Sequence, residues 1–273
     1  MKIFSSKNQC KRQTGFTLIE IAVVLVIVGL MLGGIIKGAS VQRDINKTAE
    51  EKAALANIKS TLLTFLTVNK YLPCPDTDND GLEDRNGDSC TATEGQLPSL
   101  TLGGVKARDS YGSHYIYSIN TDADTNLILR TCHSASYFAR TGVVNNTGCG
   151  TFNLPPTTPP YFQLNTHPIG ATTVIGGNLI VCSESVTTCG SGTASSGRLA
   201  EFMPVIIASL GQNGLATHDN CNNAGAIEQE NCDGDRYFHQ YYAPTDTFDD
   251  RLIWISAYEI KQALINTGVD LSP

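Results

Sequence analysis

The stretch KRQTGFTLIEIAVVLVIVGLMLGGIIKG, residues 11–38, determines how the rest of the chain is organised. From Ile21 to Ile36 every residue is uncharged, and most are aliphatic. With residues 16–18 added, the run approaches the roughly 20 residues that a helix needs to cross a bilayer. Glu20 lies near its start, where a carboxylate in lipid would cost about 2.5–3.5 kcal/mol. A charged group in such a segment needs a partner, so we expect Glu20 to have a functional role.

Positive charge precedes the apolar run and negative charge follows it. Four of the 19 Lys and Arg residues lie in the first 15 positions, whereas none of the 26 Asp and Glu residues does, so the remainder carries a net charge of −11. Basic residues before a membrane segment predict a cytoplasmic N-terminus and a body that crosses the membrane. An acidic body disfavours extended contact with nucleic acid, because such contact depends on neutralising phosphates. The sequence therefore does not predict wide nucleic-acid contact, although a small local basic patch remains compatible with it.

A partner for Glu20 can come from another copy of the chain. If the chain is cut after Gly15, Phe16 becomes a new N-terminus whose amine can neutralise Glu20 of the next copy. Glu20 would then fix the register between packed helices, which is the best-attested role of a buried ion pair. The alternatives are an ordinary signal anchor and a secretory signal peptide, which has about 7–15 apolar residues and a cleavage site after them. Here the run is longer, and the small residues Thr14 and Gly15 precede it.

The sequence GFTLIE at 15–20, followed by a long apolar run, resembles the class III signal of type IV pilins and type II secretion pseudopilins. This resemblance implies that a prepilin peptidase cleaves between Gly15 and Phe16 and methylates the new amine of Phe16. It places Glu20 at the position of the family's glutamate. It also implies a single pass through the bacterial inner membrane with the head in the periplasm, then assembly with other pilin or pseudopilin subunits into a helical filament in the periplasm or at the cell surface.

The expected function is that of a structural subunit of a type IV pilus or a type II secretion filament. The head is longer than that of a typical major pilin, which favours a minor subunit. The alternative is a binding or adhesion module at a filament tip, with a head stabilised by calcium. A membrane-anchored enzyme is not expected, because the sequence contains no HExxH, GxSxG or P-loop motif. The five histidines are scattered: His114, His133, His167, His218 and His239.

The resemblance and the local patterns together predict an α+β, pilin-like fold, in which a long N-terminal helix packs on an antiparallel β-sheet head with disulfide-stapled loops. Four segments are expected: a leader at 1–15 that is removed, a transmembrane and filament-core helix at 16–37, an amphipathic half of the same helix at 38–72, and a globular β-rich head at 73–273.

The amphipathic half is predicted from apolar residues that recur at steps of three and four. Ala53, Ala56, Leu62 and Leu66 belong to the predicted face, and Leu55 and Ile58 lie close to it. Two prolines in YLPCP stop the helix near residue 71.

Segments rich in β-branched and aromatic residues predict the strands of the head. Ser256 and Glu259 form a capping-box pattern that predicts a C-terminal helix, with Gly268 as its stop. The predicted strands are HYIYSI at 114–119, LILRTC at 127–132, NLIVCS at 178–183, MPVIIASL at 203–210 and RLIWIS at 251–256.

Eight of the nine cysteines follow the apolar run, and only Cys10 precedes it. An even number beyond a membrane segment suggests an oxidising compartment and four disulfides. Zinc ligation or free thiols are the alternative, but no CxxC spacing occurs. Composition does not fix the pairing, and pairing between neighbours in sequence is the simplest hypothesis: Cys74–Cys90, Cys132–Cys149, Cys182–Cys189 and Cys221–Cys232.

The segment CPDTDNDGLEDRNGDSC at 74–90 has the spacing of oxygen ligands in a calcium loop. Position 12 of an EF-hand would require a glutamate, and Gly87 occupies it, so the loop resembles an EF-hand or dockerin loop only in part. A solvated acidic turn is the alternative. The predicted calcium ligands are the side chains of Asp76, Asp78, Asp80 and Asp84 and the carbonyl of Leu82.

Overall fold

The structure is a computed structural model of the chain. It describes residues 15, 17–120, 135–143, 156–166, 179–212, 214, 226–243, 245 and 248–272, and within the first helix it leaves out the side chains of residues 32–42 and 44. The chain divides into two compact units, Met1–Lys47 and Thr48–Pro273, which are described separately.

The first helix, α1, runs from Leu18 to Asn69, close to the helix predicted over 16–72. At its N-terminus the amide of Glu20 donates to the carbonyl oxygen of Thr17 at 3.1 Å. At its C-terminus Lys70 adopts φ +70°, a left-handed conformation that ends the helix, and its amide donates to the carbonyl of Leu66. Pro73 follows shortly afterwards and prevents continuation.

Among the described residues, no helix combines the length and the hydropathy needed to cross a membrane.

The second unit is built on the C-terminal part of α1. Leu55, Ile58, Leu62 and Leu66 are buried at steps of three and four residues and form one side of the main hydrophobic core. The predicted face was wrong at Ala53 and Ala56, which are exposed. The helix is rotated toward its larger aliphatic side chains because burying these removes more apolar surface from water.

A four-stranded antiparallel sheet packs on this helical face, with strand order β3–β4–β7–β9. Its strands are β3 (Glu94–Gln96), β4 (Ile116–Ile119), β7 (Val205–Ser209) and β9 (Arg251–Ile255). Three of them confirm predicted strands, whereas β3 was not predicted. Every residue of β4 and β7 is buried, so this sheet is covered on both faces. Tyr117, Ile119 and Ile207 contribute to the core shared with α1, and Ile206 contributes to a second cluster.

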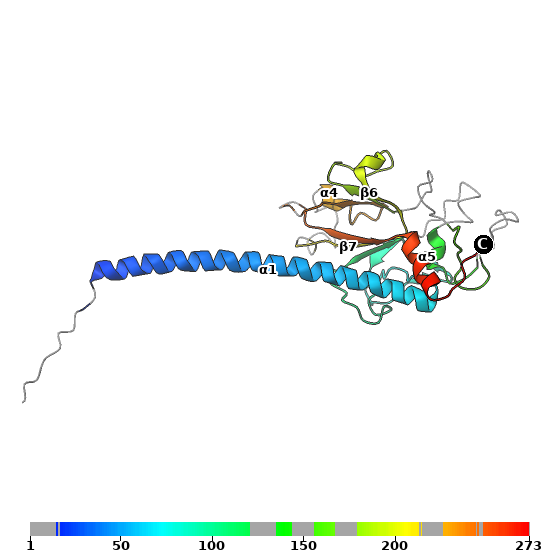
Figure 1. Cartoon of the computed structure of the whole chain (residues 1–273), viewed down its shortest axis with the longest axis horizontal. Helices are drawn as coiled ribbons and strands as arrows, with labels where there is room; N and C mark the ends of the chain where they lie inside the picture. The colour runs from blue at the N-terminus through cyan, green and yellow to red at the C-terminus, as the bar shows by residue number, and fades with distance from the viewer. Residues whose placement is uncertain are drawn as a thin grey trace, which may run out of the picture. The chain divides into compact units, whose positions relative to one another are not determined.

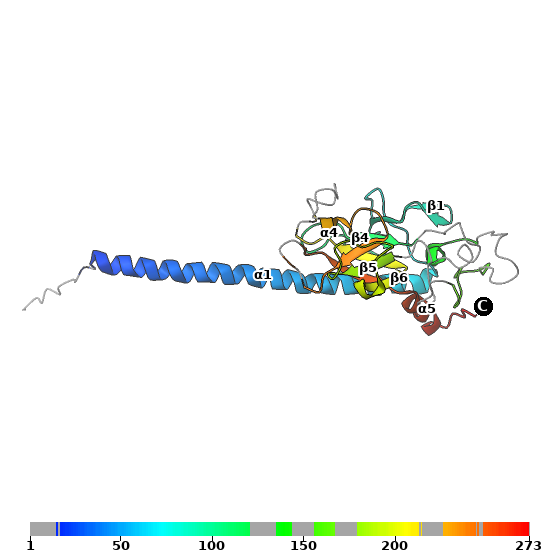
Figure 2. The same cartoon turned by 90° about the horizontal axis from the view of Figure 1, so that it is seen from above.

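A smaller sheet provides that second cluster, with strand order β6–β5–β8. Its strands are β5 (Leu179–Ser183), β6 (Arg198–Met203) and β8 (Tyr237–Gln240), and β5 and β6 lie side by side in Figure 2. The prediction of an antiparallel head was wrong here, because β5 and β8 pair in parallel. A parallel pair needs a long crossover, and the chain between β5 and β8 supplies it through β6 and β7.

The C-terminal helix α5, Ala257–Asn266, packs on the same core as α1 and is drawn in red beside it in Figure 1. It begins with the predicted capping box of Ser256 and Glu259, and Gly268 follows it with φ +83°. Glu259 also forms a salt bridge with Lys59 of α1. The shorter elements are β1 (Arg85–Asn86), β2 (Ser89–Cys90), the 3-10 helices η1 (Ala135–Ala139) and η2 (Ser195–Gly197), and α4 (Ala226–Gln229).

The outer edge of β9 is occupied by side chains from other elements. The amide of Leu252 donates to Oε1 of Gln240 at 2.7 Å. Nζ of Lys59 donates to the carbonyl of Trp254 at 2.9 Å. Two of the backbone groups that an edge strand offers to another strand are therefore already used.

Two of the predicted disulfides are present, Cys74–Cys90 and Cys182–Cys189. Cys232 is also disulfide-bonded. Its predicted partner Cys221 lies outside the described residues, as do Cys132, Cys149 and the predicted strand at 127–132.

Candidate functional site: helix N-terminus and acidic loop

The start of α1 places Glu20 in the first helical turn. The amide of Glu20 donates to Oγ1 of Thr17 at 3.4 Å, which is the contact that an N-cap threonine makes. A carboxylate near a helix N-terminus is favoured by the helix dipole, typically by about 0.3–1 kcal/mol. Thr17 was not among the predicted functional residues, although T-x-x-E at 17–20 is the sequence signature of a capping box. Phe16 lies outside the described residues, and Gly15 is exposed.

From Ile21 to Met31 the surface of α1 is apolar on all sides. Every side chain from Leu18 to Met31 is exposed. Burying one such aliphatic side chain is worth about 1.5–3 kcal/mol, so this segment favours contact with lipid or with other helices over contact with water. The large exposed residues are Leu18, Ile19, Ile21, Val23, Val24, Leu25, Val26, Ile27, Val28, Leu30 and Met31.

Comparison with protein families identifies this segment. Residues 10–36 match the family model described as the prokaryotic N-terminal methylation motif. The chain carries a pilin-type methylation motif. This motif is the signal of type IV pilins and pseudopilins, and the predicted resemblance at residues 15–20 is thereby confirmed. No curated protein and no solved structure matches the chain.

The methylation motif indicates the general class of the chain. It indicates a type IV pilin-like or pseudopilin precursor, processed by prepilin peptidase and assembled with other pilin subunits. It implies a membrane-anchored precursor of a surface or periplasmic filament. It also favours a structural subunit over an enzyme.

The acidic loop lies in the second unit, between the end of α1 and β3. Asp76 is buried, and its carboxylate accepts backbone amides from three residues of the same loop. Oδ1 accepts from Asp78 at 3.2 Å and from Asn79 at 2.8 Å, and Oδ2 accepts from Gly81 at 2.8 Å. Gly81 has φ +84°, as expected of the glycine that makes the sharp turn in such a loop. Asp76 therefore organises the backbone of the loop.

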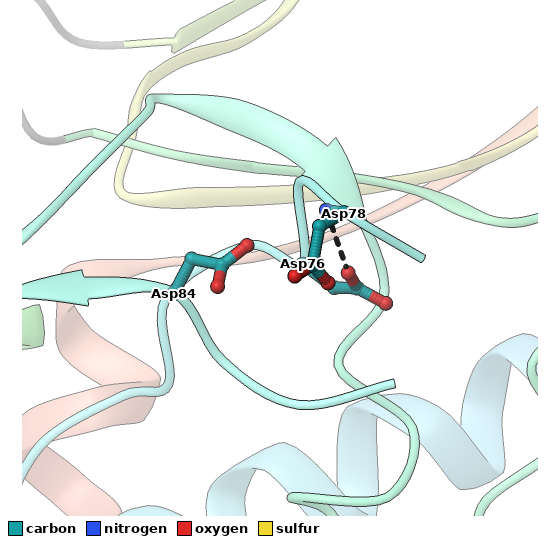
Figure 3. Close-up of side chains that lie close together, drawn as sticks. All are labelled: Asp76, Asp78 and Asp84. Carbon is teal, nitrogen blue, oxygen red and sulfur yellow. Dashed lines mark hydrogen bonds between the residues drawn. The ribbon is translucent and has the colours of Figure 1, made fainter. Parts of the chain in front are cut away.

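Three of the predicted carboxylates come together. One carboxylate oxygen from each of Asp76, Asp78 and Asp84 lies within 4.8 Å of the others. Figure 3 shows the Asp84 side chain extending toward Asp76 and Asp78 from the returning arm of the loop. The hydroxyl and amide of Thr77 donate to Asp84 and hold the pKa of its carboxyl below its usual range. Asp84 therefore stays ionised, as a metal ligand must.

The other two predicted ligands are placed differently. Asp80 is not part of this group, and its Oδ1 accepts the amide of Leu82 at 2.7 Å. The side chain of Leu82 is about half exposed, and the prediction concerned only its carbonyl oxygen.

Covalent and polar contacts fix both ends of the acidic loop. The Cys74–Cys90 disulfide closes it, with a sequence separation of 16. Arg85 pairs with Glu83 and donates to the carbonyls of Leu72 and Ala139. Spacing alone did not single out Arg85 and Glu83, because their partners are brought near only by the fold.

Proposed function

We propose that this chain is a minor pilin or pseudopilin, a structural subunit that enters a type IV pilus or a type II secretion filament through its N-terminal helix. The observation that carries the proposal is the methylation motif at the start of a helix whose apolar side chains from Leu18 to Met31 are exposed. Such a helix can leave the membrane and pack among like helices without losing apolar contact. The large second unit, Thr48–Pro273, favours a minor over a major subunit.

In this proposal the methylated amine of Phe16 on one subunit pairs with Glu20 of its neighbour. An unpaired carboxylate among apolar helices is costly, whereas a paired one fixes the axial register. The capping contact between Thr17 and Glu20 supports this role, because it holds the backbone of Glu20 in the first turn, close to the new N-terminus.

Mass spectrometry of the N-terminal peptide, from protein isolated out of its native envelope, tests the processing step. We expect a peptide that begins at N-methylated Phe16. A chain that still starts at Met1, in cells with an active prepilin peptidase, would overturn the proposal and leave a plain signal anchor.

Substitution of Glu20 tests the assembly step. We expect Glu20→Ala to be cleaved normally and yet to be at least tenfold depleted from filaments sheared off the cells. Glu50→Gln provides the matched control, because Glu50 is an exposed acid on the same helix whose salt bridge is to Lys106 of its own unit. Equal recovery of Glu20→Ala and wild type in filaments would contradict the pairing of Glu20.

Immunogold labelling of the head distinguishes a structural subunit of the filament from an adhesion module at its tip. A shaft or base position fits a structural or priming subunit. Label confined to filament tips would favour the alternative, an adhesion module. Labelling of strains that lack either the pilus or the secretion assembly system identifies the filament.

We also propose that the acidic loop binds calcium through Asp76, Asp78 and Asp84. Their convergence and the all-oxygen donor set support this, since calcium takes six to eight hard oxygen ligands. Asp80 and the carbonyl of Leu82 are the further ligands predicted from sequence. Calorimetric titration of the full chain in detergent tests the proposal, with Asp78→Asn and Asp84→Asn expected to weaken binding at this loop at least tenfold.

A further inference from the structure

A second group of carboxylates lies far from the acidic loop in sequence. Glu228 comes from α4, and Asp249 and Asp250 immediately precede β9. One carboxylate oxygen from each residue lies within 4.8 Å of the others. Calcium–oxygen distances are about 2.3–2.6 Å, so a single ion between them could contact all three carboxylates.

These carboxylates are more deeply buried than those of an ordinary acidic patch. Glu228 is 4% exposed and Asp250 is 3% exposed. Oδ2 of Asp250 accepts from Nδ2 of Asn231 at 2.8 Å. Oδ1 of Asp250 is buried and accepts no hydrogen bond from the part of the chain that the structure describes. Leaving a buried acceptor of a charged group unsatisfied is costly, so a ligand at this oxygen would be stabilising.

The charges around Asp250 are unfavourable unless a cation joins them. Glu228, Asp249 and Asp250 bring three acidic side chains together there, and two of the three are buried. Buried charges in proteins are paired or bind metal ions.

The local backbone is shaped to bring Asp249 into the group. The amide of Gln212, just beyond the end of β7, donates to Oδ2 of Asp249 at 2.6 Å. Gly211 has φ +63°, and a Cβ at this position would lie 2.3 Å from Oδ1 of Asp249. Glycine is therefore required for the carboxylate to lie against the turn. Ser209 and Arg251 are paired at the adjoining ends of β7 and β9, so the group closes that end of the sheet.

We propose that Glu228, Asp249 and Asp250 bind a divalent cation of the calcium type, forming a second site that fastens α4 to the adjoining ends of β7 and β9. Hard carboxylate oxygens are the donors that calcium prefers, and three carboxylates offset its charge. This site stands independently of the methylation motif and of the acidic loop.

Calcium chloride titrations of the full-length protein in detergent, after removal of bound metal with a chelator, test the second site. We expect two calcium ions per wild-type chain and one per Asp250→Asn chain. In an Asp78→Asn background, where the acidic loop is disabled, we expect calcium still to raise the Tm. The Asp78→Asn, Asp250→Asn double variant should lose that increase. Glu201→Gln, which removes a carboxylate from β6 outside the group, should leave both results unchanged.

Two outcomes would overturn the second site. One is an unchanged number of bound ions in Asp250→Asn; the other is an equal calcium-induced Tm increase in Asp78→Asn with and without Asp250→Asn. If Asp250→Asn does not fold, Asp249→Asn replaces it, because Asp249 is only partly buried. Loss of one bound ion in Asp78→Asn but not in the Asp249 and Asp250 variants would leave calcium at the acidic loop alone, and the second-site proposal would fail.

Discussion

At the scale of one residue, Glu94 shows how burial changes the pKa of a carboxyl group in the head. It lies on β3, where Oε2 accepts from the hydroxyl of Ser118 at 2.7 Å. Burial raises the pKa of its carboxyl to about 7, and Asp233 and Asp235 add to this effect. The hydrogen bond from Ser118 opposes the change without overcoming it. Glu94 is therefore protonated in part at neutral pH.

The raised pKa makes stability depend on pH in a defined direction. The folded chain holds the Glu94 proton more tightly than the unfolded chain does. The contribution of this proton to the free energy of unfolding is therefore fully present below about pH 4.5 and is lost as pH rises through about 7. We expect Glu94→Gln to raise the free energy of unfolding by about 2 kcal/mol at pH 8 and to change it little at pH 4.5. Urea denaturation of the full chain in detergent across this range provides the measurement.

Glu201→Gln serves as the control for Glu94→Gln, because it removes a carboxylate from β6 at a partly exposed position. An equal effect of Glu94→Gln at pH 4.5 and pH 8 would show that protonation of Glu94 does not govern the change.

At the scale of elements, α5 depends on its first turn. Oγ of Ser256 accepts the amide of Glu259, and the Glu259 carboxylate accepts the amide of Ser256. The same carboxylate pairs with Lys59, so the cap also ties α5 to α1. Two otherwise unsatisfied amides of the helix are thus provided with acceptors.

We expect Ser256→Ala to lower the free energy of unfolding by about 1 kcal/mol, the usual cost of losing an N-cap. Ser256→Asp should restore most of the loss, since aspartate caps about as well as serine. Thermal denaturation compares both variants with Ser191→Ala, a change at an exposed loop position. If Ser256→Asp is no more stable than Ser256→Ala, capping is not the cause.

Some elements could be predicted from local sequence and others could not. β4, β7 and β9 follow from runs of β-branched and aromatic residues, and α1 from its continuous periodicity. β3, β6 and β8 were missed because EGQ, RLAEFM and YFHQ mix polar and apolar residues, and only pairing with neighbouring strands makes them strands.

The acidic loop could be predicted because Asp76, Asp78 and Asp84 are near in sequence. Glu228 and Asp250 are far apart in sequence, so only the fold brings them together.

At the scale of the whole molecule, the disulfides act on separate parts of the head. Cys74–Cys90 surrounds the acidic loop, with a sequence separation of 16, and Cys182–Cys189 closes a loop with a separation of 7. In the chain-entropy model both contribute to stability, with about 3 kcal/mol for the longer loop. Only the longer loop holds Asp76, Asp78 and Asp84.

We expect the Cys74→Ala, Cys90→Ala pair to lower the free energy of unfolding by about 3 kcal/mol and to weaken calcium binding at the acidic loop at least tenfold. The Cys182→Ala, Cys189→Ala pair is the matched control, because it should also destabilise the head but leave that affinity unchanged. Denaturation and calcium titration of both pairs make the comparison. Equal loss of affinity in the two would mean that general destabilisation, and not the acidic loop itself, is responsible.

The occupied edge of β9 has a consequence for the chain when many copies are crowded together. Lys59 and Gln240 use two of the backbone groups through which a strand of a neighbouring copy would add to the sheet. When heads are held at high local concentration, this occupied edge therefore disfavours edge-to-edge pairing of β9 with a strand of a neighbouring copy. Lys59 and Gln240 thus favour solubility under crowding, a role that their positions in the sequence do not indicate.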